Sequence, residues 1–156
     1  ETLRGTAHGG HCARRRAKSA LLVFNGWFIM AREVISTPNA PKAIGTYSQA
    51  VKVGKTVYVS GQIALDPVSG EMQQSSIEVE IRRVFDNLKA IVTGAGGNFS
   101  QVTRATVFIL DFGIFPTLNK IMAEYFSEPY PSRVTVQVCA LPKNANVEID
   151  CIVELD

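Results

Sequence analysis

A strict alternation of side chains near the end of the chain constrains the fold more than any other feature. From residue 147 to residue 155 every odd position is apolar, and the even positions carry three acids: Glu148, Asp150 and Glu154. Successive side chains of a β-strand point to opposite faces of a sheet, so this pattern predicts a strand with one buried face. Residues 132–138 alternate in the same way, with valines on one face and three polar side chains on the other: Arg133, Thr135 and Gln137.

Another segment has the period of an amphipathic helix. Between residues 77 and 92, apolar side chains recur at steps of three and four, and polar side chains such as Glu80 and Asn87 fall on the opposite, outward face. Ser75 and Glu78 have the spacing of a capping box at the start of this helix. A run of glycines after it predicts where the helix ends.

The order of the predicted elements defines a fold class. A second helix is expected to begin near residues 111–115 and to end before Pro129, and strands are expected at 55–60 and 102–110. Together with the two alternating segments, this order predicts an α+β domain in which both helices pack on one face of the sheet.

The opposite sheet face is expected to stay uncovered by helices. We place on it a mixed set of side chains: Tyr58, Arg133, Thr135, Gln137, Glu148 and Asp150. Packing this face against copies of the same chain would bury it and would create clefts between subunits. The sequence therefore predicts a closed homo-oligomer.

Composition excludes several classes of site. Residues 30–156 hold eleven basic and thirteen acidic side chains and no histidine. A Ser-His-Asp or Cys-His catalytic site and a histidine metal site are thereby excluded from this segment. The three cysteines form no close pair in the sequence, so no disulfide framework and no zinc site is predicted. A net charge of −2 disfavours nucleic acid as a partner, because nucleic acid binding needs a basic surface.

Residues 1–29 differ from the rest of the chain. They hold five basic side chains and one acid, and they end in an apolar stretch that is too short to span a bilayer. An Arg-rich, acid-poor composition fits a mitochondrial presequence loosely. We favour the interpretation that this extension is a tag or upstream-translated sequence, and that residues 30–156 form a single domain.

Two side chains of the alternating strands could carry chemistry. Because residues 141–146 form a short loop, we expect the two strands to pair as an antiparallel hairpin, which would bring Arg133 and Glu148 out on the same face. The pair could be a cross-strand ion pair. It could also be a carboxylate-binding arginine beside a carboxylate base, since a guanidinium group binds a carboxylate with two parallel hydrogen bonds.

Four motifs resemble one family. They are Ala43-Ile-Gly-Thr-Tyr-Ser-Gln49, Val59-Ser-Gly-Gln-Ile63, Pro131-Ser-Arg-Val-Thr-Val136 and Leu141-Pro-Lys-x-x-x-Val-Glu-Ile149. In this order and spacing, over roughly residues 33–155, they are similar to the reactive intermediate deaminase (YjgF-type) family. The resemblance implies a chorismate-mutase-like α+β fold with a mixed sheet, assembled as a homotrimer with active sites between subunits. It further implies hydrolysis of 2-enamine and 2-imine acids, such as 2-aminoacrylate and 2-iminobutanoate, to 2-keto acids and ammonia.

The resemblance also assigns roles to residues. Arg133 would hold the substrate carboxylate, and Glu148 would position or activate the attacking water. The substrate pocket would be lined by Tyr47, Ser60, Gly61, Gln62, Thr135 and Asn119. An imine carbon is already electrophilic, so the reaction requires neither a metal nor a cofactor. Position 135 departs from the pattern of many members, which carry cysteine there, and this puts the substrate preference in doubt.

Two alternatives to a deaminase remain open. One is an endoribonuclease or translation inhibitor, an activity ascribed to some animal relatives. The other is a trimer without catalytic activity that binds small carboxylates or works as a chaperone-like regulator. The expected partners are a small 2-imino acid and further copies of the chain, with no membrane partner. We expect a cytoplasmic location, or a mitochondrial one if residues 1–29 form a presequence.

Overall fold

The computed structural model describes residues 22–24, 27–29 and 31–156, and the chain divides into two units with a boundary after Ala31. In the first unit, β1 (Leu22–Phe24) pairs antiparallel with β2 (Trp27–Ile29). Most of the predicted extension lies outside the described residues, so its role stays a prediction. In the described part of the chain, no helix combines the length and the hydropathy that a membrane crossing needs.

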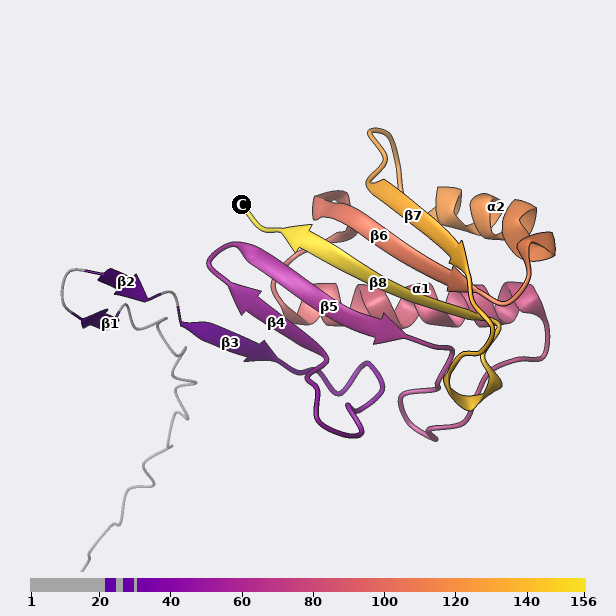
Figure 1. Cartoon of the computed structure of the whole chain (residues 1–156), viewed down its shortest axis with the longest axis horizontal. Helices are drawn as coiled ribbons and strands as arrows, with labels where there is room; N and C mark the ends of the chain where they lie inside the picture. The colour runs from indigo at the N-terminus through magenta and orange to yellow at the C-terminus, as the bar shows by residue number, and fades with distance from the viewer. Residues whose placement is uncertain (1–21, 25–26, 30) are drawn as a thin grey trace, which may run out of the picture. The chain divides into compact units, whose positions relative to one another are not determined.

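The second unit is built on one six-stranded sheet (Figure 1). Its elements follow in the order β3 (Arg32–Ile35), β4 (Ala50–Val53), β5 (Thr56–Gln62), α1 (Ile77–Gly94), β6 (Val102–Ile109), α2 (Phe115–Tyr125), β7 (Ser132–Gln137) and β8 (Val147–Glu154). Short 3-10 turns at Phe99–Gln101, Phe112–Ile114 and Pro142–Asn144 join them. The strands lie side by side as β3-β4-β5-β8-β6-β7, and all neighbours are antiparallel except β6 and β7, which are parallel.

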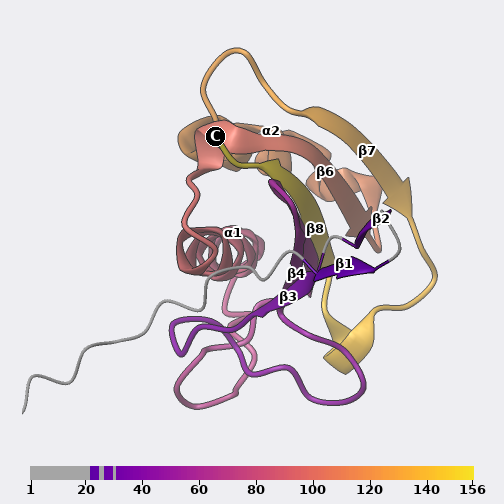
Figure 2. The ribbon, with the colours of Figure 1, turned by 90° about the vertical axis from the view of Figure 1, so that its left-hand side faces the viewer.

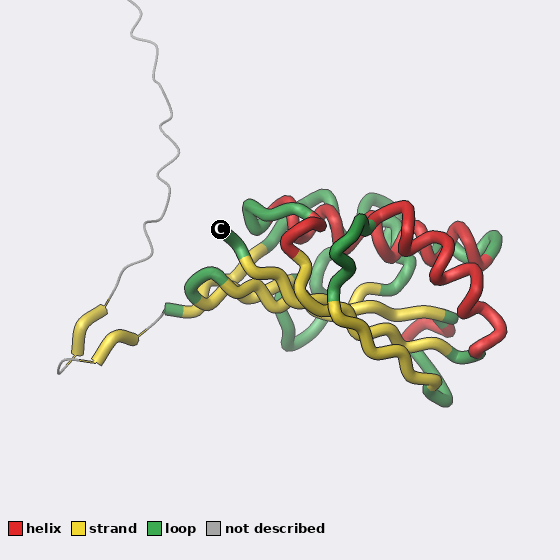
Figure 3. Tube along the Cα trace, turned by 90° about the horizontal axis from the view of Figure 1, so that it is seen from above, coloured by secondary structure: helices red, strands yellow, loops and turns green. Residues whose placement is uncertain are grey.

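Both helices cover the same face of the sheet, which curves around them (Figure 2). Seen from above, the helices form one layer and the strands form the other (Figure 3). The apolar stripe of α1 meets the alternate side chains of the central strands in a core whose members are all buried, among them Val57, Phe85, Leu88, Val107 and Ile149. Full burial of each such side chain contributes about 1.5–3 kcal/mol. This architecture confirms the predicted α+β fold with a mixed sheet and two helices on one face.

The start of α1 differs from the prediction. Its N-cap is Ser76, whose hydroxyl accepts a hydrogen bond from the Val79 backbone N–H at 3.2 Å. The capping box expected at Ser75 was therefore placed one residue too early. Glu80 and Asn87, expected on the outward face of the helix, are each only 1% exposed. The prediction is wrong for both residues because their side chains bind backbone groups of neighbouring loops, and a helical pattern does not reveal such partners.

The predicted hairpin is wrong. The chain passes from β6 through α2 to β7, and such a crossover returns the strand parallel to β6. β7 therefore takes the outer edge of the sheet, and β8 pairs with β5 and β6 in the middle. The short loop between β7 and β8 spans the width of β6 instead of closing a hairpin.

The face of the sheet that the helices leave open carries apolar side chains. Val34, Tyr58, Val134 and Val136 are 58%, 51%, 42% and 38% exposed. The residues that flank these four along their strands point toward the helices, so the four side chains themselves point to the open face. An antiparallel or mixed sheet with this composition on its open face is typical of a surface that another layer covers.

Candidate active site

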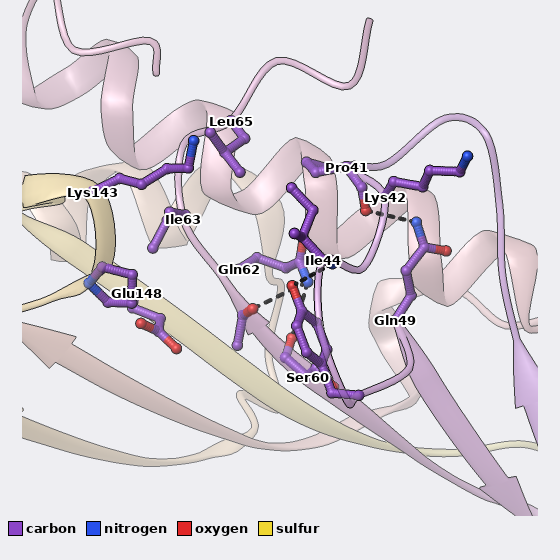
Figure 4. A pocket seen from close by; sticks show the side chains of 13 residues that line it. Pro41, Lys42, Ile44, Gln49, Ser60, Gln62, Ile63, Leu65, Lys143 and Glu148 are labelled. Carbon is purple, nitrogen blue, oxygen red and sulfur yellow. Dashed lines mark hydrogen bonds between the residues drawn. The ribbon is translucent and has the colours of Figure 1, made fainter. Parts of the chain in front are cut away.

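Glu148 lies at the edge of a cavity of about 590 Å³ where β5 ends and β8 begins (Figure 4). The cavity is lined by Pro41, Lys42, Ile44, Tyr47, Gln49, Ser60, Gly61, Gln62, Ile63, Leu65, Pro142, Lys143 and Glu148. Four of the residues predicted to form a pocket therefore meet Glu148 in one place: Tyr47, Ser60, Gly61 and Gln62. Apolar walls around a few convergent polar groups are typical of a small-molecule site.

A bulge in β5 brings its backbone close to Glu148. Val59 pairs with Cys151 and Gln62 with Ile149, so Ser60 and Gly61 together oppose a single residue of β8. A Cβ atom on Gly61 would lie 2.0 Å from Oε1 of Glu148. Only glycine allows the backbone and the carboxylate to come this close.

The environment of Glu148 makes it a stronger base. Its side chain is half-buried, and burial raises the pKa of the Glu148 carboxyl above its ordinary value. The negative charge of Asp150, two residues along the same strand face, raises this pKa further. A carboxylate with a raised pKa accepts a proton from water more readily, as a general base must.

Three further side chains shape the cavity on the side of β5. The backbone N–H of Ile44 donates to the Tyr47 hydroxyl at 3.3 Å, which closes a loop over the cavity. The Ser60 hydroxyl donates to the carbonyl of Ser48 at 2.6 Å and ties the bulge to the same segment. Gln62 donates to the carbonyl oxygens of Ser60 and Gly61, both at 3.2 Å.

Arg133 lies in a different place. Its Nη1 donates to Oδ1 of Asn119 on α2 at 2.7 Å, and its guanidinium carbon lies 5.1 Å from the ring centroid of Phe115. A second cavity of about 400 Å³ surrounds it, lined by Asn119, Met122, Ala123, Phe126, Tyr130, Pro131 and Arg133. The guanidinium group is thus held in a fixed orientation at the edge of the domain.

The expectation that Arg133 and Glu148 share one sheet face is wrong. Arg133 is level with Ala105, which is buried beneath the helices, whereas Glu148 is level with Phe108 on the open face. β6 lies between their strands, so the strands are two spacings, or about 10 Å, apart. Arg133 and Glu148 of the same chain therefore form no ion pair.

Thr135 and Gln137 follow Arg133 to the helix-covered face, and the expectation that they share the face of Glu148 is wrong for the same reason. Thr135 is level with Val107, which is fully buried, and among the described residues nothing accepts or donates a hydrogen bond at its buried Oγ1. Thr135 lines neither of the two cavities.

Comparison with known proteins identifies the family. Residues 37–155 match the family model described as Endoribonuclease L-PSP. The chain belongs to this family. It is 47% identical over 125 residues to a 2-iminobutanoate/2-iminopropanoate deaminase of Dermatophagoides farinae, which covers 80% of this chain and 98% of the relative. The predicted reactive intermediate deaminase family is thereby confirmed.

Solved structures of L-PSP relatives share the fold. RidA from the Antarctic bacterium Psychrobacter sp. is 46% identical, with a TM-score of 0.77 over 79% of this chain and 99% of its own. TdcF of E. coli, solved with bound serine, is 38% identical, with a TM-score of 0.76 over 80% of this chain and 99% of its own.

Sequence reasoning assigned no role to one buried residue of this L-PSP domain. The Gln49 side chain is 4% exposed and donates to the carbonyl oxygens of Thr37, Ala40 and Pro41 at 3.1, 3.2 and 2.8 Å. It thereby holds the loop that forms the cavity wall opposite Glu148 (Figure 4). Gln49 stands in one of the family motifs, but the sequence carries no signal for the loop carbonyls that it binds.

Among the described residues, no three His, Cys, Asp or Glu side chains gather as they would to hold a metal ion.

Proposed function

We propose that the chain hydrolyses short 2-imino acids, such as 2-iminobutanoate and the imine form of 2-aminoacrylate, to 2-keto acids and ammonia. The observation that carries this proposal is the Glu148 carboxyl, whose pKa burial and Asp150 raise, in an apolar cavity beside a glycine that admits it. The relative from Dermatophagoides farinae, which carries the name of this activity, supports the substrate class.

The reaction needs few catalytic groups from the protein. The C2 carbon of an imino acid is electrophilic, so a water molecule held by Glu148 adds to it when the carboxylate takes a proton from that water. The proton that Glu148 took from the water passes to the imine nitrogen, which gives a carbinolamine. When the hydroxyl proton is then transferred to the amino group, the C2–N bond breaks, ammonia leaves and the carbonyl of the keto acid forms. Positioning of the acid and of the water provides the rate enhancement.

The substrate carboxylate needs a cation close to Glu148. Lys42 and Lys143 line the cavity, but their amino groups point away from the Glu148 carboxylate (Figure 4). We propose that Arg133 of a neighbouring subunit supplies the cation, with Asn119 fixing its guanidinium group. A guanidinium group with a free edge can bind a carboxylate through two parallel hydrogen bonds. Glu148 and Arg133 would then act from two chains, as catalytic base and substrate anchor, and Tyr47, Ser60, Gly61 and Gln62 would line the site.

The exposed apolar side chains of the open sheet face support assembly. Leaving Val34, Tyr58, Val134 and Val136 in water is unfavourable, and neighbouring copies of the chain would cover them. A cyclic homotrimer, which the family resemblance implies, would form three such contacts and three composite sites.

The expected cytoplasmic location also stays a prediction.

A coupled assay tests the activity. Threonine dehydratase generates the imine from threonine, and keto-acid formation is followed while a trapping amine competes for the imine. We expect the wild-type protein to accelerate hydrolysis, Glu148→Gln to lower the rate by about 100-fold or more, and Arg133→Ala to raise KM for the imine. Lys89→Ala, which removes an exposed positive charge from the outer face of α1, is the control and should match the wild type.

If the assembled wild-type protein does not exceed the spontaneous rate, the deaminase proposal is wrong. The same preparations incubated with labelled RNA test the endoribonuclease alternative that the family description raises. RNA binding needs phosphate contacts, and the net charge of −2 over residues 30–156 works against them.

A further inference from the structure

The loop that enters β8 is strained where it borders the Glu148 cavity. Pro142 and Lys143 line the cavity, and Lys143 and Asn144 have φ angles of 53° and 56°. Two consecutive residues other than glycine in the left-handed region cost free energy that surrounding contacts must offset. Lys143 lies on the same side of the cavity as Glu148, with its amino group turned away from the carboxylate (Figure 4). The backbone of this loop, and not the charge of Lys143, thus forms the wall next to Glu148.

A buried carboxylate on α1 holds this loop. Oε1 of Glu80 accepts the Asn146 backbone N–H at 2.7 Å, and Oε2 accepts the Asn146 side-chain amide at 2.8 Å. Gln74 adds a third tie, since its amide donates to the carbonyl of Asn144 at 2.9 Å and lies 3.4 Å from Oε1 of Glu80. The strained turn is therefore fastened on its inner side, two residues before Glu148.

A carboxylate at this position is a poor choice for stability alone. Glu80 is 1% exposed, and within the described residues the only ion pair joins Arg82 to Glu124, so no cation offsets its burial. Burial of a charged group is unfavourable even when it is hydrogen-bonded, and an apolar side chain of similar size would add to the helix stripe. What Glu80 provides instead is a fixed conformation for one loop.

We propose that Glu80 is a positioning residue, which holds the Pro142–Asn146 loop and thereby sets the geometry of Glu148 for catalysis. This inference rests on the proposed deaminase function. Glu80 reaches neither cavity itself and acts through the two hydrogen bonds to Asn146. Since Arg133 belongs to a different set of contacts, loss of Glu80 should impair turnover more than substrate binding.

Three variants separate positioning from simple stability. Glu80→Leu keeps the volume and leaves the Asn146 N–H without its acceptor, so the loop should shift. Glu80→Gln keeps an acceptor for that N–H, and its NH2 can donate to the Asn146 amide oxygen once that amide flips. Asn146→Ala removes only an exposed side chain and one of the two hydrogen bonds, so it should fold even if Glu80→Leu does not. Glu78→Gln, on the exposed face of the same helix turn, is the matched control.

The readouts are kcat and KM for 2-iminobutanoate, measured on oligomers of verified size, and amide hydrogen exchange of residues 142–147. For Glu80→Leu we expect kcat to fall by about tenfold or more, because a misplacement of the order of 1 Å costs up to about 100-fold, with KM within twofold. Exchange of the Asn146 amide should rise at least tenfold. Glu80→Gln should restore kcat to within about threefold of the wild type, and Asn146→Ala should lower it in the same direction as Glu80→Leu.

The two proposals fail in different ways. A wild-type protein without imine hydrolysis contradicts the deaminase function itself. An active wild type, with Asn146→Ala and folded Glu80→Leu both matching Glu78→Gln in kcat and in Asn146 exchange, overturns the role of Glu80. The role of Glu80 is also overturned if Glu80→Gln does not reverse the fall in kcat. It is likewise overturned if kcat falls in all variants only in proportion to the loss of oligomer stability.

Discussion

At the scale of single residues, Gly61 decides how close the backbone of β5 comes to Glu148. Its own φ angle needs no glycine, so the reason for glycine here is the space that Oε1 of Glu148 occupies. The neighbour that an added methyl group would meet is the mobile end of a side chain and not a backbone atom. Substitution should therefore displace the carboxylate before it disturbs the fold.

Gly61→Ala should consequently separate activity from stability. We expect a loss of about 100-fold in kcat/KM, because Oε1 must retreat by about 1 Å or more, and a loss of about 1 kcal/mol in unfolding free energy, the low end for overpacking. Denaturant unfolding and the coupled assay measure the two. In the double variant Gly61→Ala/Glu148→Ala the clash is absent, so its stability should equal that of Glu148→Ala alone; a further loss in the double variant would contradict this explanation.

Asp150 is predicted to set the acid side of the pH profile. Its negative charge raises the pKa of Glu148, and the base form of Glu148 is lost as pH falls through that pKa. Asp150→Asn removes the repulsion and lowers the pKa of Glu148, so the fall in kcat on the acid side should move to lower pH.

The pH dependence of kcat between pH 4 and pH 8 measures this shift. Glu154→Gln, an acid on the same strand and face but farther from Glu148, should leave the profile where it is. A profile that Asp150→Asn moves to higher pH, or does not move, would show that Glu148 is not the titrating base.

At the scale of elements, the N-terminus of α1 depends on one hydroxyl. Ser76 caps the Val79 N–H, and the adjacent Ser75 makes no such bond. Ser76→Ala should therefore lower the unfolding free energy by about 1 kcal/mol, whereas Ser75→Ala should change it by less than about 0.5 kcal/mol. Denaturant unfolding of the two variants, matched in chemistry and one residue apart, checks the cap; equal losses would argue for the capping box at Ser75.

Periodicity predicted the elements but not their neighbours. The alternation in β8 and most of the apolar stripe in α1 identified the buried face, because burial imposes a period of two or of 3.6 residues. In β7 the alternation separated two faces, but the valines lie on the open face and the polar side chains on the helix-covered face. Which strand lies next to which depends on the crossover through α2, and a short loop between β7 and β8 favoured the wrong pairing. The wrong pairing placed Arg133 on the same face as Glu148, whereas the structure places it on the opposite face. No property of either strand alone would have corrected this prediction.

Buried polar residues that hydrogen-bond to loops were the other feature that the sequence did not predict. Gln49 and Glu80 bind loop groups whose need for a partner arises only in the folded chain. Their side chains look like surface residues in the sequence because a polar residue in an amphipathic helix, or next to a strand, normally faces water. Family motifs located the cavity of Tyr47, Ser60, Gly61 and Gln62 with Glu148, since they record spatial proximity that periodicity does not.

At the scale of the whole molecule, the separation of Arg133 from Glu148 restricts how copies of the chain can assemble into an active oligomer. One chain presents a base in one cavity and a guanidinium group in another, on opposite faces and with β6 between them. If both act on one substrate, they must come from different copies. The exposed valines of the open sheet face offer the contact through which a second copy could bring them together.

Mixing two impaired variants tests this arrangement directly. Arg133→Ala retains Glu148, and Glu148→Gln retains Arg133, so a site between one subunit of each kind can hold both groups. In randomly reassembled cyclic oligomers of an equal mixture, about a quarter of the sites receive both intact residues, because each site takes one group from each of two neighbours. Measured at an imine concentration well below the KM of Arg133→Ala, the unfolded and refolded mixture should therefore show about a quarter of the wild-type activity, while each variant refolded alone stays nearly inactive. A mixture as inactive as its parts, in oligomers shown to contain both variants, would place the complete site within one chain and would contradict a composite site.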